Sequence, residues 1–71
     1  MTRYSFQITN GQNFLHSEEL ASDAAAWHEA ILTVRDIEST LSSEGGDWSL
    51  EVKRNEKPIF RIDVTARRIE P

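Results

Sequence analysis

A chain of 71 residues suits one small domain, and domains of this size bury only about 60% of the surface that the unfolded chain exposes. There is no cysteine, which excludes disulfides and thiolate metal sites, and the net charge of −4 disfavours nucleic acid as a partner. Residues 1–47 hold two basic and eight acidic side chains, whereas residues 48–71 hold six and four, so only the C-terminal part could oppose that repulsion. We expect a single domain over residues 1–71.

The N-terminal residues do not resemble a signal peptide, because apolar and polar side chains alternate in MTRYSFQIT. Nor is any apolar run long enough to span a bilayer. We therefore expect a cytoplasmic protein with no membrane partner.

The N-terminal segment predicts a β-hairpin. Tyr4, Phe6 and Ile8 alternate with polar residues over residues 3–9, which is typical of a strand with one wet face. Asn10-Gly11 then supplies a turn that tolerates positive φ angles. A short partner strand over about residues 13–17 should return alongside the first.

A helix is predicted from Asp23 to about Leu41, with Ser22 as its N-cap. Its apolar side chains fall on one stripe at helical spacing, and they are Ala24, Trp27, Ile31, Val34 and Leu41, flanked by Ala30 and Ile37. The segment SSEGGD should end the helix, with Gly45-Gly46 as the break.

Residues 23–30, DAAAWHEA, place a tryptophan, a histidine and a glutamate side by side. On a helix these neighbours point in three directions, so we expect Trp27 in the core, His28 at its flank and Glu29 in solvent. The helical zinc spacing His-x-x-x-His is absent. The segment predicts no metal site and no cofactor.

Two further side chains leave alternatives open. Glu38 lies within the apolar stripe, and it either extends past the end of the sheet, which we favour, or is partly buried against an arginine such as Arg35. His16 is either an exposed edge histidine, again favoured, or part of a pH-sensitive ion pair with Glu18 or Glu19. Neither forms a catalytic constellation, so we expect no catalytic residues and no enzyme.

The C-terminal third predicts a second hairpin. Residues 47–54 and 58–67 each alternate apolar and polar side chains, and NEKP forms the turn between them. Pro58, which has no backbone N–H, suits the first position of the last strand.

These elements predict an α+β domain in the order β-β-α-β-β, with the single helix on one face of a four-stranded sheet. A right-handed crossover would make the first and last strands central and parallel. The expected sheet is therefore mixed, with strand order 2-1-4-3.

The segments MTRYSFQI and EELASDAAAWHEA together resemble a small bacterial family of unknown function. Its members begin Met-x-Arg-Tyr-x-Phe and carry an acidic-leucine stretch before an alanine-rich helix. The matching positions are Arg3, Tyr4, Phe6, Glu19, Leu20, Ala25, Ala26, Glu29 and Ala30. The sequence departs from the family pattern at Thr2, Ser5 and Ala21. The resemblance implies no activity, cofactor or site residue.

The C-terminal hairpin carries the candidate interaction surface. Its members are basic or outward-facing apolar side chains, namely Ile59, Arg61, Arg67, Arg68 and Ile69. Asp63 and Glu70 interrupt the basic residues, and no aromatic alternates with them as binding of single-stranded nucleic acid would need. The third strand, Asp47–Arg54, is expected at a sheet edge, where it or the open face could pair two copies.

The function expected from these features is a non-catalytic interaction domain that forms a homodimer or binds another protein. The alternative is a regulatory or antitoxin-like protein that binds a toxin or nucleic acid. Small antitoxins of the HicB type also run from a strand pair into an alanine-rich helix, although their Leu-Pro-Gly-Cys segment is absent here.

Overall fold

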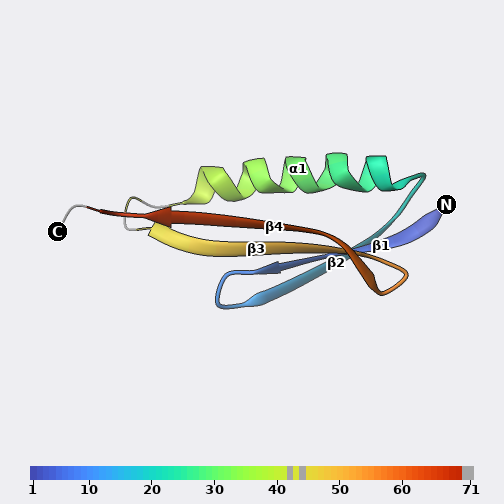
Figure 1. The fold of residues 1–71 in the computed structure, drawn as a ribbon, viewed down its shortest axis with the longest axis horizontal. Coiled ribbons are helices and arrows are strands. Elements are labelled where there is room, and N and C mark those ends of the chain that lie inside the picture. The colour runs from blue at the N-terminus through green and yellow to red at the C-terminus, as the bar shows by residue number, and fades with distance from the viewer. Residues whose placement is uncertain (42, 44, 70–71) are drawn as a thin grey trace.

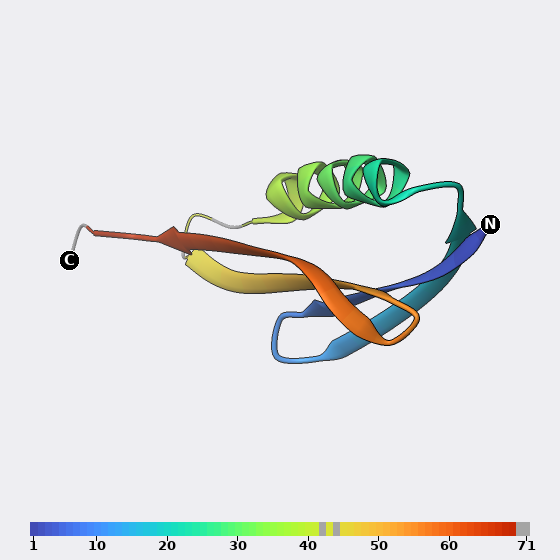
Figure 2. The ribbon, with the colours of Figure 1, turned by 45° about the vertical axis from the view of Figure 1, so that its right-hand side comes forward.

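The computed structural model describes residues 1–41, 43 and 45–69. Its elements are β1 (Thr2–Thr9), β2 (Asn13–Leu20), α1 (Asp23–Thr40), β3 (Gly45–Arg54) and β4 (Lys57–Arg67) (Figure 1). Turning the molecule shows α1 on one face of the four-stranded sheet and leaves the other face open (Figure 2). The predicted α+β class and the element order β-β-α-β-β are confirmed.

The strand order and the strand directions differ from the prediction. The order is β2-β1-β3-β4 and every neighbouring pair is antiparallel, so the mixed sheet with order 2-1-4-3 was wrong. This order avoids a parallel ladder, whose slanted hydrogen bonds are slightly less stable. It also leaves β4 at an edge of the sheet. Pro58 has no backbone N–H, and at an edge no further strand needs that donor.

The third strand is central, which overturns its expected place at the sheet edge. β3 pairs with β1 over residues 49–54 and with β4 along its length. Its inward side chains Leu50 and Val52 are almost completely buried, as a central strand requires. Dimerisation through the edge of this strand, as the sequence suggested, is therefore wrong, because the two edge strands are β2 and β4.

Both predicted hairpins are present, with changes at their ends. Asn10–Gln12 connects β1 to β2, and Gly11 has a φ of +95°. β2 extends to Leu20 instead of ending near residue 17. In the second hairpin, Asn55 and Glu56 alone form the turn, both with positive φ, as a two-residue hairpin loop requires.

The N-cap of α1 is confirmed, because the Ser22 hydroxyl accepts a hydrogen bond from the Ala25 N–H at 3.1 Å. The glycine pair that was predicted to break the chain instead begins β3. A Cβ atom at Gly45, whose φ is +101°, would lie 2.6 Å from the Ala66 carbonyl oxygen. Residues 42 and 44 of the predicted break lie outside the described residues.

The buried face of α1 is built mainly from alanine. Ala26, Ala30 and Ile37 are its buried residues, and the two alanines pack against Tyr4, Phe6, Leu50 and Val52 of the sheet. Small side chains let the helix axis approach the sheet closely, because they leave the large rings of β1 room to fill the space between the layers.

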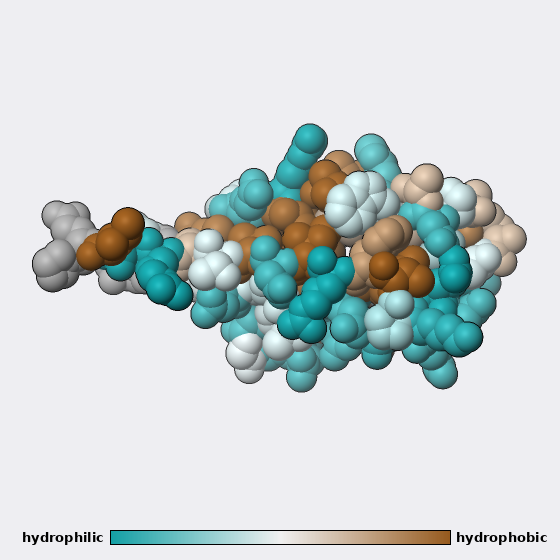
Figure 3. Space-filling view, in the orientation of Figure 1, coloured by the Kyte–Doolittle hydropathy of each residue, from teal (hydrophilic) through white to brown (hydrophobic). Residues whose placement is uncertain are grey.

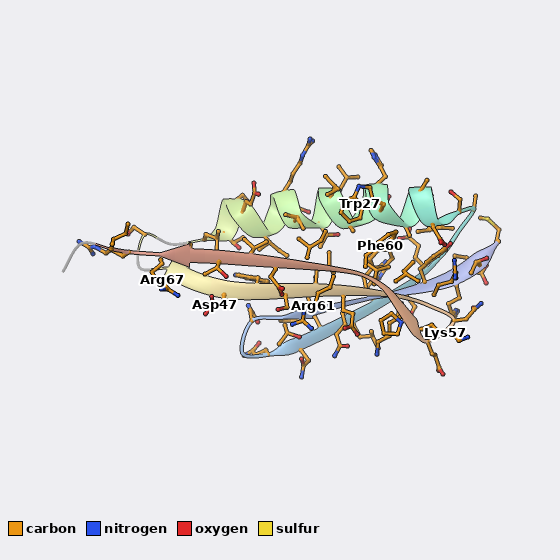
Figure 4. All side chains as sticks on the ribbon, in the orientation of Figure 1. Trp27, Asp47, Lys57, Phe60, Arg61 and Arg67 are labelled. Carbon is orange, nitrogen blue, oxygen red and sulfur yellow. The ribbon has the colours of Figure 1, made fainter. Side chains whose placement is uncertain are left out.

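Trp27 is 44% exposed, so its predicted place in the core was wrong. Its indole meets Phe60 of β4 (Figure 4). The two ring centroids are 5.1 Å apart in an edge-to-face arrangement. Glu38 is exposed, so the alternative of partial burial against an arginine was wrong. β3 and β4 continue past the C-terminal end of α1 (Figure 1), so the favoured alternative, in which Glu38 extends past the end of the sheet, was wrong too.

Candidate functional site

The β2 edge, residues 13–20, is the less protected of the two sheet edges. It is a regular strand without lysine or proline, which are residues that commonly block unwanted strand pairing. Phe14 lies on the helix side of the sheet, opposite Ile8 of β1, and is 50% exposed. Leu15 points to the open face and is 71% exposed. Two large apolar side chains therefore flank an edge whose outer backbone groups can receive another strand.

A groove of about 270 Å³ lies between the β2 edge and α1. Its lining residues are Phe6 and Ile8 from β1, His16 and Glu18 from β2, and Glu29 and Thr33 from α1. The groove is therefore apolar where β1 lines it and carries two carboxylates, a hydroxyl and an imidazole on its walls. Such a lining suits an apolar side chain of a partner.

The polar side chains of the groove correct one expectation and refine another. Glu29 was expected in solvent but is half-buried as part of the groove wall. His16 is exposed, as favoured, and its Nε2 atom also lies 3.6 Å from a carboxylate oxygen of Glu18. Its ring centroid is 6.3 Å from that of Phe6, so the imidazole covers one side of the apolar part of the groove.

A second cluster joins the start of α1 to the sheet. The Tyr4 hydroxyl donates a 2.6 Å hydrogen bond to Asp23 Oδ1, and the Arg54 guanidinium donates to Oδ2 of the same carboxylate. The Tyr4 hydrogen bond, assisted by Arg54, lowers the pKa of Asp23. The hydrogen bond to Asp23, with burial and the negative charge, raises the pKa of Tyr4. Tyr4 is only 1% exposed, whereas the side chains of Asp23 and Arg54 are partly exposed, so the buried hydroxyl ties the start of α1 to the sheet.

The open face of the sheet is polar and internally paired. Arg61 lies within 4 Å of carboxylate oxygens of both Glu51 and Asp63, and the Ser49 hydroxyl donates to Asp63 at 2.8 Å. The Ser49 hydrogen bond, followed by the Arg61 guanidinium, lowers the pKa of Asp63. Among the residues that the structure describes, this face carries no aromatic side chain on which a base could stack, and Arg61 is already paired with carboxylates.

The five residues proposed from the sequence as an interaction surface are not brought together. Ile59 is the extra residue of a β-bulge opposite Val52 and Lys53, and it packs against the core instead of facing outward. Arg61 lies at the middle of β4 and Arg67 at its end, well separated (Figure 4). Arg68 and Ile69 follow the strand, and Ile69 is 93% exposed.

Apolar side chains on the helix side gather along the seam between α1 and the sheet, with hydrophilic ones below it (Figure 3). Across the described ranges 1–41, 43 and 45–69, no cluster of three or more His, Cys, Asp or Glu side chains could hold a metal ion. Within those same residues no helix has the length and apolarity needed to cross a bilayer.

One known protein family matches most of the chain. Residues 3–65 match the family described as a domain of unknown function, DUF6894. The chain belongs to this family. The match confirms the predicted membership of a small family of unknown function. No curated protein and no solved structure shows significant similarity to the chain.

The sequence did not identify Phe14, Leu15 or the groove as a candidate surface. The one available signal was the adjacent pair Phe14-Leu15, which breaks the alternation expected of a strand with one buried face. An apolar residue on each face of an edge strand cannot be covered by one helix. That pattern indicates a strand with an exposed apolar side chain that a partner could cover.

Proposed function

We propose that the chain is a non-catalytic protein-interaction domain that binds a partner by adding a strand to the β2 edge. The observation that carries this proposal is the contrast between the two sheet edges. β4 contains Pro58 and a bulge at Ile59, both of which hinder strand addition. β2 is regular and is flanked by the exposed side chains of Phe14 and Leu15.

Strand addition supplies affinity through backbone hydrogen bonds and specificity through pockets for alternate side chains. The groove beside β2 offers such a pocket on the helix side, because its β1 lining, Phe6 and Ile8, is apolar. A partner strand paired with β2 would direct every second side chain to the helix side of the sheet, where the groove lies. The partner would thus bind the free backbone groups of β2 and the neighbouring groove, which form one continuous surface.

The remaining ionisable clusters support a non-catalytic role. Asp23 is engaged by Tyr4 and Arg54, and Asp63 by Ser49 and Arg61. The His16–Glu18 pair lies on an exposed strand, and Ser17, the serine nearest in sequence, points to the other face. The hydroxyl of Thr33, which shares the groove with this pair, donates its hydrogen bond to the Glu29 carbonyl oxygen. General acid–base chemistry would need a reacting group positioned by such a pair.

The experiment isolates complexes of the tagged chain from cells whose genome encodes it, and compares the natural chain with two variants. We expect Phe14→Lys to abolish the complex, because a charge would enter the apolar contact beside the paired edge. Thr65→Lys is the matched control, since Thr65 is exposed on the other edge strand. Hydrogen exchange on the purified complex should show slower exchange in residues 13–20. A complex that survives Phe14→Lys, or protection confined to other segments, would contradict the proposal.

A further inference from the structure

We infer that the strand added to β2 is β2 of a second copy of the chain, paired antiparallel about a two-fold axis. This inference rests on the proposed function and names its partner.

Symmetry limits the possible registers. Residues directly opposite each other in an antiparallel pair point to the same face of the sheet. A two-fold axis that relates two antiparallel strands is perpendicular to the sheet and keeps each side chain on its own face. A symmetric pair therefore centres on one residue, which lies opposite itself, and both helices lie on the same side of a continuous sheet.

The length of β2 reduces the choice to two centres. A centre at His16 pairs residues 13–19 within the strand, and a centre at Ser17 pairs residues 14–20. Centres nearer either end of the strand leave more of its backbone unpaired. Because every second residue of a paired segment exchanges main-chain hydrogen bonds with the neighbouring strand, the two registers that pair the longest segments are the strongest candidates.

Side-chain chemistry selects the centre at Ser17. In this register, Phe14 lies opposite Leu20 of the second copy and His16 lies opposite Glu18, and each pair occurs twice. A centre at His16 would instead place Phe14 opposite a glutamate and the imidazole opposite itself. Apolar pairs and donor–acceptor pairs stabilise cross-strand neighbours more than an apolar side chain opposite a carboxylate does. The Ser17 register has one such unlike pair, Leu15 opposite Glu19, and it lies on the open face.

The edges that remain also favour the dimer. Pairing through β2 joins the two sheets into one and leaves β4 of each copy at the outside. Those edges carry Pro58 and the bulge at Ile59, so the assembly closes at two copies instead of growing into a fibre. Leu15, exposed in the single chain, would lie beside the aliphatic part of Glu19 from the second copy.

The absence of natural cysteine allows a direct test by oxidation of single-cysteine variants of the full chain. In the proposed register the two copies of residue 17 lie opposite each other, at a Cα separation of about 5 Å that a disulfide can span. Ser17→Cys should therefore cross-link at least about tenfold faster than matched variants at other exposed sites.

Leu15→Cys and Glu19→Cys are the matched variants, because both sites are exposed and share the open face with Ser17. Each alone places its two thiols about 14 Å apart, four residues along the strand, and should not cross-link. Mixed together, they should form the heterodimer, since residue 15 lies opposite residue 19. Equal cross-linking at all three sites, or a different best pair, would overturn the register.

Sedimentation of the unmodified chain separates this inference from the proposed function. A two-copy species at tens of micromolar that dissociates on dilution is expected. A single species of monomer mass, together with no preferred cross-link at Ser17, would overturn the second copy as partner. The proposed function would still stand if Phe14→Lys abolished a complex with a different protein, and it would fail if that variant kept the complex.

Discussion

Gly45 sets how closely β3 begins beside β4. Its φ of +101° disfavours any residue with a Cβ, and that atom would lie 2.6 Å from the Ala66 carbonyl oxygen. We expect Gly45→Ala to lower the free energy of unfolding by about 2–4 kcal/mol, since backbone strain and a backbone clash act together. Gly11→Ala is the control, because Gly11 has a φ of +95° but open space around it, and it should cost only about 1–2 kcal/mol. Equal losses in urea unfolding would show that the close approach is unimportant.

Asp23 couples the stability of the fold to acid. Its pKa is lowered in the folded chain, so its stabilising contribution is present above the ordinary aspartate pKa of about 3.9 and is lost as pH falls below that value. Tyr4→Phe removes the hydrogen bond that contributes most to this shift. We expect unfolding midpoints measured from pH 5 downward to fall less steeply in the variant, with Arg54 at Asp23 and the lowered pKa of Asp63 supplying the remaining slope. An unchanged slope would contradict the role assigned to Tyr4.

The same tyrosine predicts an alkaline limb. Because the pKa of Tyr4 is raised in the folded chain, its contribution is complete below about pH 10 and is lost as pH rises through the higher folded value. Phenylalanine cannot ionise, so Tyr4→Phe should lack this component of the alkaline loss of stability. The absorbance change of tyrosinate provides the check, since Tyr4 is the chain's single tyrosine and should titrate late while the fold persists.

At the scale of the helix, the alanine face determines the distance between the layers. Ala30 is fully buried against the sheet, so Ala30→Leu should cost about 1–3 kcal/mol through overpacking. That loss corresponds to a fall of roughly 4–8 °C in melting temperature per kcal/mol for a domain of this size. Ala24→Leu is the matched control, because Ala24 is exposed and the same change should be nearly neutral. A benign Ala30→Leu would place another face of α1 against the sheet.

The helix and the four strands could be predicted from the sequence, but the order of the strands in the sheet could not. Alternation and helical spacing show which side chains share a face, and they correctly indicated four strands and one helix. They do not show which strands are adjacent, and Pro58 was the one residue that marked β4 as an edge strand. Trp27 misled the helix prediction because its hydrophobicity outweighed that of the alanines, which in fact allow the close contact.

At the scale of the whole molecule, the candidate surface depends on strand order more than on composition. The strand order places β4 at one edge and β2 at the other, so the exposed residues Phe14 and Leu15 lie on an edge strand. The linear sequence does not show this position. Ile59 was expected to face outward because strict alternation was assumed. The bulge turns it toward the core, and a one-residue irregularity of this kind leaves no clear signal in the pattern.

Association also predicts a stability that depends on protein concentration. If folded copies pair through β2, mass action raises the melting temperature of the natural chain by several degrees between about 5 and 200 μM. Ser17→Lys should abolish this dependence, because the proposed register places the two ammonium groups directly opposite each other. Ser17 is exposed, so the variant should keep the fold and melt near the low-concentration value of the natural chain at every concentration. Thr65→Lys carries the same charge on β4 and should retain the dependence. A melting temperature of the natural chain that stays constant over this range would contradict pairing of folded copies.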